Sequence, residues 1–182
     1  MTVEMTLSHD WFPRPLPANI SIGERTWIYS SFAFLHYGSR QPCGLRIGND
    51  SGIYNGTFFD LGPSGEIEIG NFCAIVGAII SCNSRVVIDD YTFVAHDVVI
   101  ADRYAATPPV EESRPSAPYD WDSKSSISIG ANAWIGTRAV LLAGARIGDG
   151  AIVGAATVVD FDVPACSIVA GNPARVVSAI QR

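Results

Sequence analysis

The sequence predicts an all-β fold in which short parallel strands wind into a triangular β-helix. Aliphatic or aromatic residues recur every six positions along most of the 182 residues, and the next residue is often glycine. A period of six fits neither an α-helix, with 3.6 residues per turn, nor a plain alternating strand. It fits a short strand followed by a corner, and three such units would close one coil of about 18 residues.

The repeat supplies 17 large anchor residues, which we expect to point into the coil. Small or β-branched residues usually stand four positions after an anchor and should point inward as well. We expect the glycine after an anchor to relieve the tight corner. A glycine-rich sandwich is the alternative, but so many anchors in one register argue against it. The anchors are Ile22, Ile28, Phe34, Ile47, Ile53, Phe59, Ile69, Ile75, Ile88, Val94, Ile100, Ile129, Ile135, Leu141, Ile147, Val153 and Val159.

The spacing between coil starts locates an insertion. Ile129 and Ile147 are 18 residues apart, as in one plain coil, whereas Ile88 and Ile129 are 41 apart, which leaves 23 extra residues. The insertion at 103–126 contains four prolines, which prevent a regular helix or central strand. A long loop on a rigid scaffold often carries function, and a solvated excursion is the alternative. The register also slips at Ser81, where an anchor is expected.

The continuous repeat, interrupted only by the insertion, predicts a single domain over residues 1–182. With 48% apolar and 16% charged residues, the chain can bury a substantial core. In chain order the parts would be an N-terminal arm at 1–19, coils at 20–102, the loop at 103–126, coils at 127–165 and a short C-terminal tail at 166–182.

Charge, hydropathy and cysteine spacing narrow the function classes. The net charge of 12 − 18 = −6 argues against nucleic-acid binding, which depends on basic residues. The sequence has no apolar run long enough for a transmembrane helix, and its first residues lack the basic start and apolar run of a secretion signal. The four cysteines form no CxxC pair, so we predict no metal site; free thiols are typical of a cytoplasmic protein.

The last third of the chain carries a more specific pattern. Residues 127–177 contain the segments IGANAWIG, IGDGAIVGAATVV, DVP and AGNPARVV. They resemble the hexapeptide-repeat acyltransferases, in particular the sugar and xenobiotic O-acetyltransferase branch. The resemblance implies a left-handed parallel β-helix, a homotrimer and acetyl-CoA as co-substrate. It also implies that acceptor and donor bind in a groove between the triangular β-helices of two subunits and contact residues of both.

His96 is the candidate general base. A transferase that joins a hydroxyl or amine to a thioester needs a base that titrates near neutral pH, and histidine is the usual choice. His96 stands two residues after the anchor Val94, at a position that should project outward from the coil. The stretch VAHD at 94–97 resembles the segment around the base in the acyltransferases of lipid A and of bacillosamine-type sugars. Asp97 would then orient or tune the imidazole.

Other positions remain open for the base. In the sugar acetyltransferase branch it commonly lies a few residues later, at the start of the loop, where this chain reads ADRYA without a histidine. His36 could reach the same groove from a neighbouring coil, and the stretch Asp102–Tyr104 is a further candidate. An exposed surface position is the alternative for His96, and we expect His9 in the arm to be uninvolved.

The resemblance also assigns a donor site. It implies that Trp134 walls the pantetheine groove, that Thr137 lines it and that the backbone of Ala155 contacts the pantetheine arm. Arg175 would meet a CoA phosphate, for which a guanidinium is suited because it binds in a bidentate manner. The alternatives are packing at a trimer interface for Trp134 and a solvated charge for Arg175.

The repeat and the resemblance together predict a CoA-dependent acetyltransferase that moves an acetyl group from acetyl-CoA to a hydroxyl or amine of a sugar or other small molecule. A non-catalytic trimeric scaffold or binding protein is the main alternative. A γ-class carbonic anhydrase shares the fold but needs three zinc histidines, two of them close in sequence. The histidines here are 27 and 60 residues apart, which argues against that class.

Overall fold

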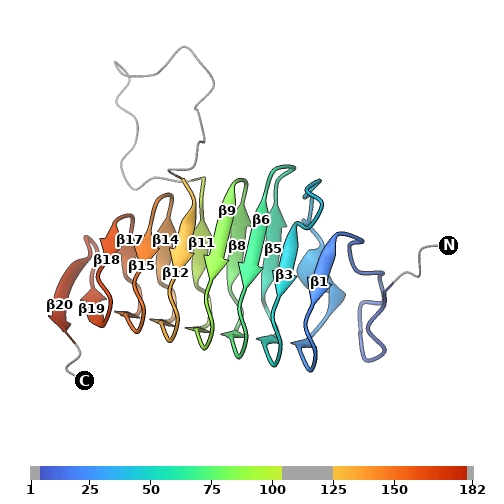
Figure 1. The fold of residues 1–182 in the computed structure, drawn as a ribbon, viewed down its shortest axis with the longest axis horizontal. Helices are drawn as coiled ribbons and strands as arrows, with labels where there is room; N and C mark the ends of the chain where they lie inside the picture. Colours follow the sequence, from blue (N-terminus) through green and yellow to red (C-terminus); the bar gives the residue numbers. More distant parts are fainter. Residues whose placement is uncertain (1–4, 104–124, 180–182) are drawn as a thin grey trace, which may run out of the picture.

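A computed structural model of the chain describes residues 5–103 and 125–179. These residues form a parallel β-helix of three faces, with strands that stack along the long axis of the molecule from β1 to β20 (Figure 1). The first face has seven strands, the second eight and the third five. All strand pairs are parallel except β19 with β20. The structure therefore confirms the predicted all-β coil.

Six complete coils each contribute one segment to every face. The first face holds β1 (Ile20–Ile22), β3 (Leu45–Ile47), β6 (Glu66–Ile69), β9 (Arg85–Ile88), β12 (Ile127–Ile129), β15 (Arg146–Ile147) and β18 (Asp162–Val163). The second holds β2 (Trp27–Ile28), β4 (Gly52–Ile53), β7 (Ala74–Ile75), β10 (Phe93–Val94), β13 (Trp134–Ile135), β16 (Ile152–Val153), β19 (Ser167–Ala170) and β20 (Arg175–Ala179). The third holds β5 (Phe58–Leu61), β8 (Ile79–Cys82), β11 (Val99–Ala101), β14 (Val140–Leu142) and β17 (Val158–Val159). In the first coil, the 3₁₀ helix η1 (Ser31–Phe34) takes the place of the third strand.

The core is a set of stacked anchor residues, as the period of six predicts. Sixteen of the 17 anchors are buried, and Ile22 packs half-buried against them. Anchors pair with anchors across neighbouring strands: Ile47 lies opposite Ile69, and Val94 opposite Ile135. Full burial of one such side chain contributes about 1.5–3 kcal/mol. Each coil is thus held mainly by the coils on either side of it.

A shorter corner explains the slip of the register at Ser81. Most connections from the second to the third face have four residues, but the one from β7 to β8 has only three, Val76–Ala78. Ile80 consequently occupies the inward position, opposite Phe59 and Ile100. The missing residue leaves the corner of the third coil smaller than its neighbours.

We expected the glycine that follows an anchor to relieve the tight corner, and this explanation was wrong. Positive φ angles fall two residues later, for example at Asp50 with φ 54° in the coil that contains Gly48. Gly48 is needed because a Cβ there would lie 2.6 Å from the carbonyl carbon of Gly70 in the next coil. Close approach of the coils, and not backbone freedom, is therefore what favours glycine at this position.

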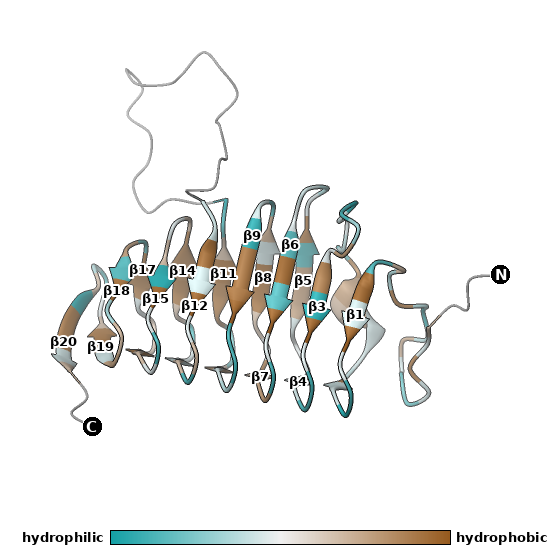
Figure 2. Ribbon diagram, viewed as in Figure 1, coloured by the Kyte–Doolittle hydropathy of each residue, from teal (hydrophilic) through white to brown (hydrophobic). Residues whose placement is uncertain are grey.

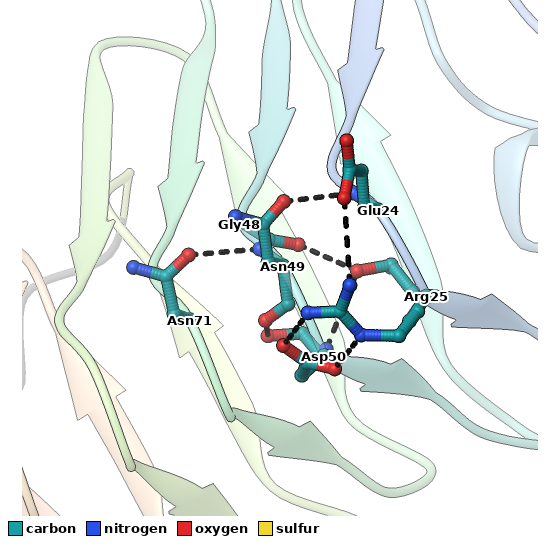
Figure 3. Close-up of polar contacts among 8 residues, drawn as sticks. Glu24, Arg25, Gly48, Asn49, Asp50 and Asn71 are labelled. Carbon is teal, nitrogen blue, oxygen red and sulfur yellow. Dashed lines mark hydrogen bonds and ion pairs between the residues drawn. The ribbon is translucent and has the colours of Figure 1, made fainter.

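Polar side chains at the first corner, which joins the first to the second face, link successive coils (Figure 3). The Asn49 side chain accepts the backbone N–H of Glu24 at 2.8 Å, and the Asn71 side chain accepts that of Asn49 at the same distance. Arg25 donates two hydrogen bonds of 2.6 Å to the Asp50 carboxylate. The two asparagine contacts satisfy corner N–H groups that the strand ladders leave free.

The residue that precedes the large insertion is held by the coils. Asp102 is buried and accepts backbone N–H bonds from Asn83, at 2.9 Å, and Ser84, at 2.7 Å. Most of the expected loop, residues 104–124, lies outside the described residues.

Strand β19, within the segment expected as a tail, continues the second face by pairing with β16, and β20 then returns antiparallel. No helix among the described residues is long and apolar enough to cross a membrane.

The close approach of the coils at Gly48 can be tested by adding one methyl group. Gly48→Ala should lower the free energy of unfolding by about 1–3 kcal/mol, because backbone atoms of the next coil must move. Gly154→Ala is the matched control, since a Cβ there would have its nearest contact at 3.2 Å. Urea unfolding measures both variants. Equal losses in the two would contradict the packing explanation.

Candidate functional site

The second corner, which joins the second face to the third, gathers four of the six predicted site residues: His96, Asp97, Thr137 and Ala155. It consists of the segments 54–57, 76–78, 95–98, 136–139 and 154–157. His96, Thr137 and Ala155 occupy equivalent places in three successive coils and are all exposed. Backbone hydrogen bonds connect these segments: Arg138 N–H donates to the His96 carbonyl at 3.0 Å, and Ala156 N–H to the Thr137 carbonyl at 2.9 Å. Neighbouring coils are about 5 Å apart, so the three residues form one short column.

His96 faces solvent at the N-terminal end of this column. Within residues 5–103 and 125–179, no side chain hydrogen-bonds its imidazole, so the ring is available to a ligand. Its Cδ2 would lie 3.7 Å from a Cβ built on Gly77, in the short corner of the preceding coil. Glycine therefore leaves one side of the imidazole open.

Asp97 lies beside His96 but its carboxylate is directed to another partner. Its backbone has φ 58°, and its N–H donates to the Gly77 carbonyl at 2.9 Å. The carboxylate Oδ2 is 3.7 Å from Nε of Arg138, and both side chains are well exposed. An exposed ion pair of this kind contributes little to stability. It pairs the Asp97 carboxylate with a cation of the next coil.

Trp134 stands on the second face, immediately before the corner that holds Thr137. It is 54% exposed and lies opposite Phe93 of β10, with ring centroids 6.2 Å apart. Arg175 is exposed on β20, three strands beyond Trp134 on the same face. Three ladder steps correspond to about 14 Å. The predicted donor residues thus occupy one side of His96, toward the C-terminal coils.

The other histidines lie elsewhere. His36 is exposed just after η1 in the first coil, three coils away from His96, so one chain does not bring the two together. His9 donates from Nε2 to the Ile28 carbonyl at 2.8 Å and stacks on Trp27 at 4.0 Å. Asp102 is committed to backbone N–H groups, as described above, and Tyr104 lies outside the described residues. His9 and Asp102 therefore act structurally.

Sequence reasoning missed a hollow of about 200 Å³ at the N-terminal end of the second corner. We call it the aromatic hollow and define it by six of its lining residues: Trp11, Tyr29, Phe32, Tyr54, Asn55 and Phe58. Tyr29 and Tyr54 are exposed at the start of their corners, and Trp11 comes from the N-terminal arm. The exposed corner tyrosines were a signal in the sequence, but the contribution of Trp11 was not.

Hydrogen bonds fix the arm that carries Trp11. The Asp10 carboxylate accepts from the Ser30 hydroxyl at 2.6 Å, from Ser31 N–H at 2.7 Å and from Phe12 N–H at 2.9 Å. Partial burial raises the pKa of this carboxyl, but these hydrogen bonds outweigh it and hold the pKa well below its usual range. The wall of the hollow is thus tied to the first coil.

A second hollow, of about 310 Å³, lies on the first face and is lined by charges. Glu68 bridges Arg46, at 3.9 Å, and Arg85, at 2.8 Å. The polar residues of β3, β6 and β9 form adjoining bands on this face (Figure 2). The side chains are about half exposed, and each cation already has an anionic partner. Among the described residues, no three His, Cys, Asp or Glu side chains come together as metal ligands.

Comparison with known proteins agrees with this geometry. The model of the bacterial transferase hexapeptide (six repeats) matches residues 126–160. Over this segment the chain resembles the bacterial hexapeptide-repeat transferases. Galactoside O-acetyltransferase of Escherichia coli is 31% identical over 142 residues, which cover 74% of this chain and 63% of that protein. The match to an acetyltransferase relative from Staphylococcus aureus (strain MRSA252) covers 27% of that relative's length. The chain therefore spans less than two thirds of the length of each of these two relatives.

Solved structures share the hexapeptide-repeat fold. An acetyltransferase from Vibrio cholerae in complex with acetyl-CoA has a TM-score of 0.59 at 25% identity, over 76% of this chain and 72% of that one. An N-acyltransferase from Bacillus cereus in complex with dTDP and CoA has a TM-score of 0.64 at 18% identity, over 89% and 85%. The latter likeness shows the fold alone. The resemblance to hexapeptide-repeat acetyltransferases and the left-handed parallel β-helix are thereby confirmed.

The attachment of the arm predicts a pH-dependent stability. Asp10→Asn should lower the free energy of unfolding by about 1–2 kcal/mol at pH 7, because the amide nitrogen cannot accept the Ser31 N–H. The pKa of Asp10 is lower in the folded chain. Its contribution is therefore present above about pH 4 and is lost as the pH falls toward the folded value.

Urea unfolding at pH 7 and pH 3 measures this effect, and the difference between wild type and variant should shrink at pH 3. Asp162→Asn is the control, because the Asp162 carboxylate has only an exposed contact of 3.8 Å with Arg146. A loss for Asp10→Asn that is equal at both pH values would contradict the account.

Proposed function

We propose that the chain is a CoA-dependent acetyltransferase, which moves an acetyl group from acetyl-CoA to a hydroxyl or amine of a small molecule. The observation that carries the proposal is the column of His96, Thr137 and Ala155 at the second corner, with Trp134 beside it. The comparisons support it, because one relative is a galactoside O-acetyltransferase and one similar structure holds acetyl-CoA. A sugar is accordingly one candidate acceptor.

The reaction needs one base and a site for a developing oxyanion. The His96 imidazole takes the proton of the acceptor hydroxyl or amine, and the freed lone pair attacks the thioester carbonyl carbon. Backbone N–H groups stabilise the oxyanion of the tetrahedral intermediate. The carbon–sulfur bond then breaks, and the CoA thiolate leaves and receives the proton from the imidazolium. Asp97 helps to position His96, because its backbone N–H donates to the Gly77 carbonyl at 2.9 Å and fixes the corner that carries the imidazole.

The donor extends from His96 toward the C-terminal coils. Trp134 walls the pantetheine and Thr137 lines its path, while the small Ala155 lets the pantetheine approach the backbone. Arg175, at the far end of the second face, binds a phosphate of CoA. The length of the face between Trp134 and Arg175 suits an extended cofactor chain, because the residues are three strands apart.

The proposed enzyme is a homotrimer in which a neighbouring subunit completes the groove. Large apolar side chains are exposed on and beside the second face, which supports an interface there. Phe93 and Trp134 are 39% and 54% exposed, and Phe72 stacks on Tyr91 at the adjoining corner. A groove closed by a second subunit would also exclude water from the thioester.

His96→Ala tests the proposed base. The substitution should lower kcat by about 10²- to 10⁴-fold, the usual contribution of a general base. Binding of acetyl-CoA should be retained, because other residues form the donor site. Thiol release from acetyl-CoA, followed with a panel of hydroxyl and amine acceptors, measures the rate.

His36→Ala is the matched control for His96→Ala. It removes another exposed histidine, three coils away, and should leave kcat unchanged. Nearly full activity of His96→Ala would show that the base is elsewhere. Wild-type protein that binds acetyl-CoA but transfers nothing to any acceptor would favour the scaffold alternative.

A further inference from the structure

We infer that the aromatic hollow binds an uncharged aromatic group of the acceptor, and that the acceptor reaches His96 from there along the second corner. The inference rests on the proposed acetyl transfer and adds to it a recognition site two coils away from the base. The observations that carry it are the composition of the hollow, its fixed wall and the two glycines that stand between it and His96.

The hollow presents several aromatic side chains to one small volume. Trp11 packs against Phe32 with ring centroids 5.4 Å apart, and Phe32 against Phe58 at 5.3 Å. Trp11, Tyr29 and Tyr54 nevertheless remain 60%, 39% and 43% exposed. Rings that are packed on one side and exposed on the other offer flat apolar surfaces to a ligand ring.

The charge of the lining defines the class of ligand. No charged side chain is among the described residues that line the hollow. A charged group would lose its hydration there without gaining an ionic partner, which is costly. The polar atoms available are neutral: the Asn55 amide and the hydroxyls of Tyr29 and Tyr54. An uncharged aromatic ring with hydroxyl substituents or a hydroxylated neighbour matches this lining.

The hollow is formed before any ligand arrives. The hydrogen bonds of Asp10 to Ser30 and Ser31 hold the arm against the first coil. Asp10 directly precedes Trp11, and Ser31 directly precedes Phe32. The Ser31 hydroxyl also donates to the Phe12 carbonyl. A fixed wall reduces the entropy that binding would otherwise lose.

Two glycines of the second corner stand between the hollow and the base, and we assign this stretch as the route of the acceptor. The corner residues between Asn55 and His96 include Gly56, with φ 82°, and Gly77, with φ 64°. A Cβ on Gly77 would lie 3.3 Å from the Asn55 carbonyl oxygen and 3.7 Å from His96 Cδ2. The corner that contains Gly77 is also the short corner of the third coil. Two coil steps correspond to about 10 Å, which sets the distance between the bound ring and the nucleophilic group.

Binding of two uncharged probes tests the inference without requiring transfer. We would measure Kd by calorimetry for 4-nitrophenyl β-D-galactopyranoside and for methyl β-D-galactopyranoside, which share the sugar and differ in the aromatic group. The nitrophenyl probe should bind at least about tenfold more tightly, since each aromatic contact is worth about 2- to 10-fold. Trp11→Ala and Tyr54→Ala should reduce this ratio to below about threefold.

Controls separate the hollow from general effects. Arg146→Ala removes a large exposed side chain from β15 on the first face, away from the hollow, and should leave the ratio unchanged. Circular dichroism checks that each variant is folded, and size-exclusion chromatography checks its assembly. A wild-type ratio near one, or a ratio unchanged in both hollow variants, would overturn the inference. Dissociation of the Trp11→Ala oligomer would overturn it too, because a second copy of the chain would then occupy the hollow.

Gly77→Asn tests the path. Asparagine tolerates a positive φ, as Asp97 and Arg138 do at equivalent corners, but its side chain would stand beside the imidazole. The binding ratio should persist while kcat/KM falls at least about tenfold. An unchanged kcat/KM would contradict the proposal that the acceptor reaches His96 past Gly77. Aromatic-dependent binding in a wild-type protein that transfers no acetyl group would overturn the proposed function, whereas transfer without aromatic preference would overturn only the hollow.

Discussion

The close stacking of coils is the constraint on which the rest of the structure depends. Anchors such as Ile47 and Ile69 are buried only because the next coil covers them at the spacing of a parallel sheet. At that spacing a Cβ on Gly48 would collide with backbone, and corners must turn through left-handed conformations at residues such as Asp50 and Asp97. Anchor, glycine and corner positions therefore recur together from coil to coil.

The same stacking creates a functional surface from residues that are distant in sequence. His96, Thr137 and Ala155 follow their anchors at the same distance, so they stand in one column although the insertion separates the first two. A perfectly regular column would present the same surface at every coil and would not form a distinct site. The features come from departures: the short corner at Gly77, the exposed Trp134 and the arm that brings Trp11 to the first coil. Each departure lies at the second corner or directly beside it.

Periodic features could be predicted from the sequence, and single contacts could not. The inward positions of the anchors and the outward position of His96 followed from the period of six, because burial repeats with it. The shorter corner appeared in the sequence only as a slip at Ser81. The role of Gly48 depends on atoms of the next coil, and the aromatic hollow depends on hydrogen bonds between Asp10 and Ser30 that no period indicates. The separation of His36 from His96 likewise required the order of the coils.

A crystal structure with CoA bound tests the central claim most directly, because the second corner must hold the donor for the column to act as a site. We expect the pantetheine to run past Trp134, Thr137 and Ala155, with the sulfur within about 4 Å of an imidazole nitrogen of His96, in the range of a reactive complex. CoA bound at the first face, or a sulfur more than about 10 Å from every His96 in the assembly, would contradict the account.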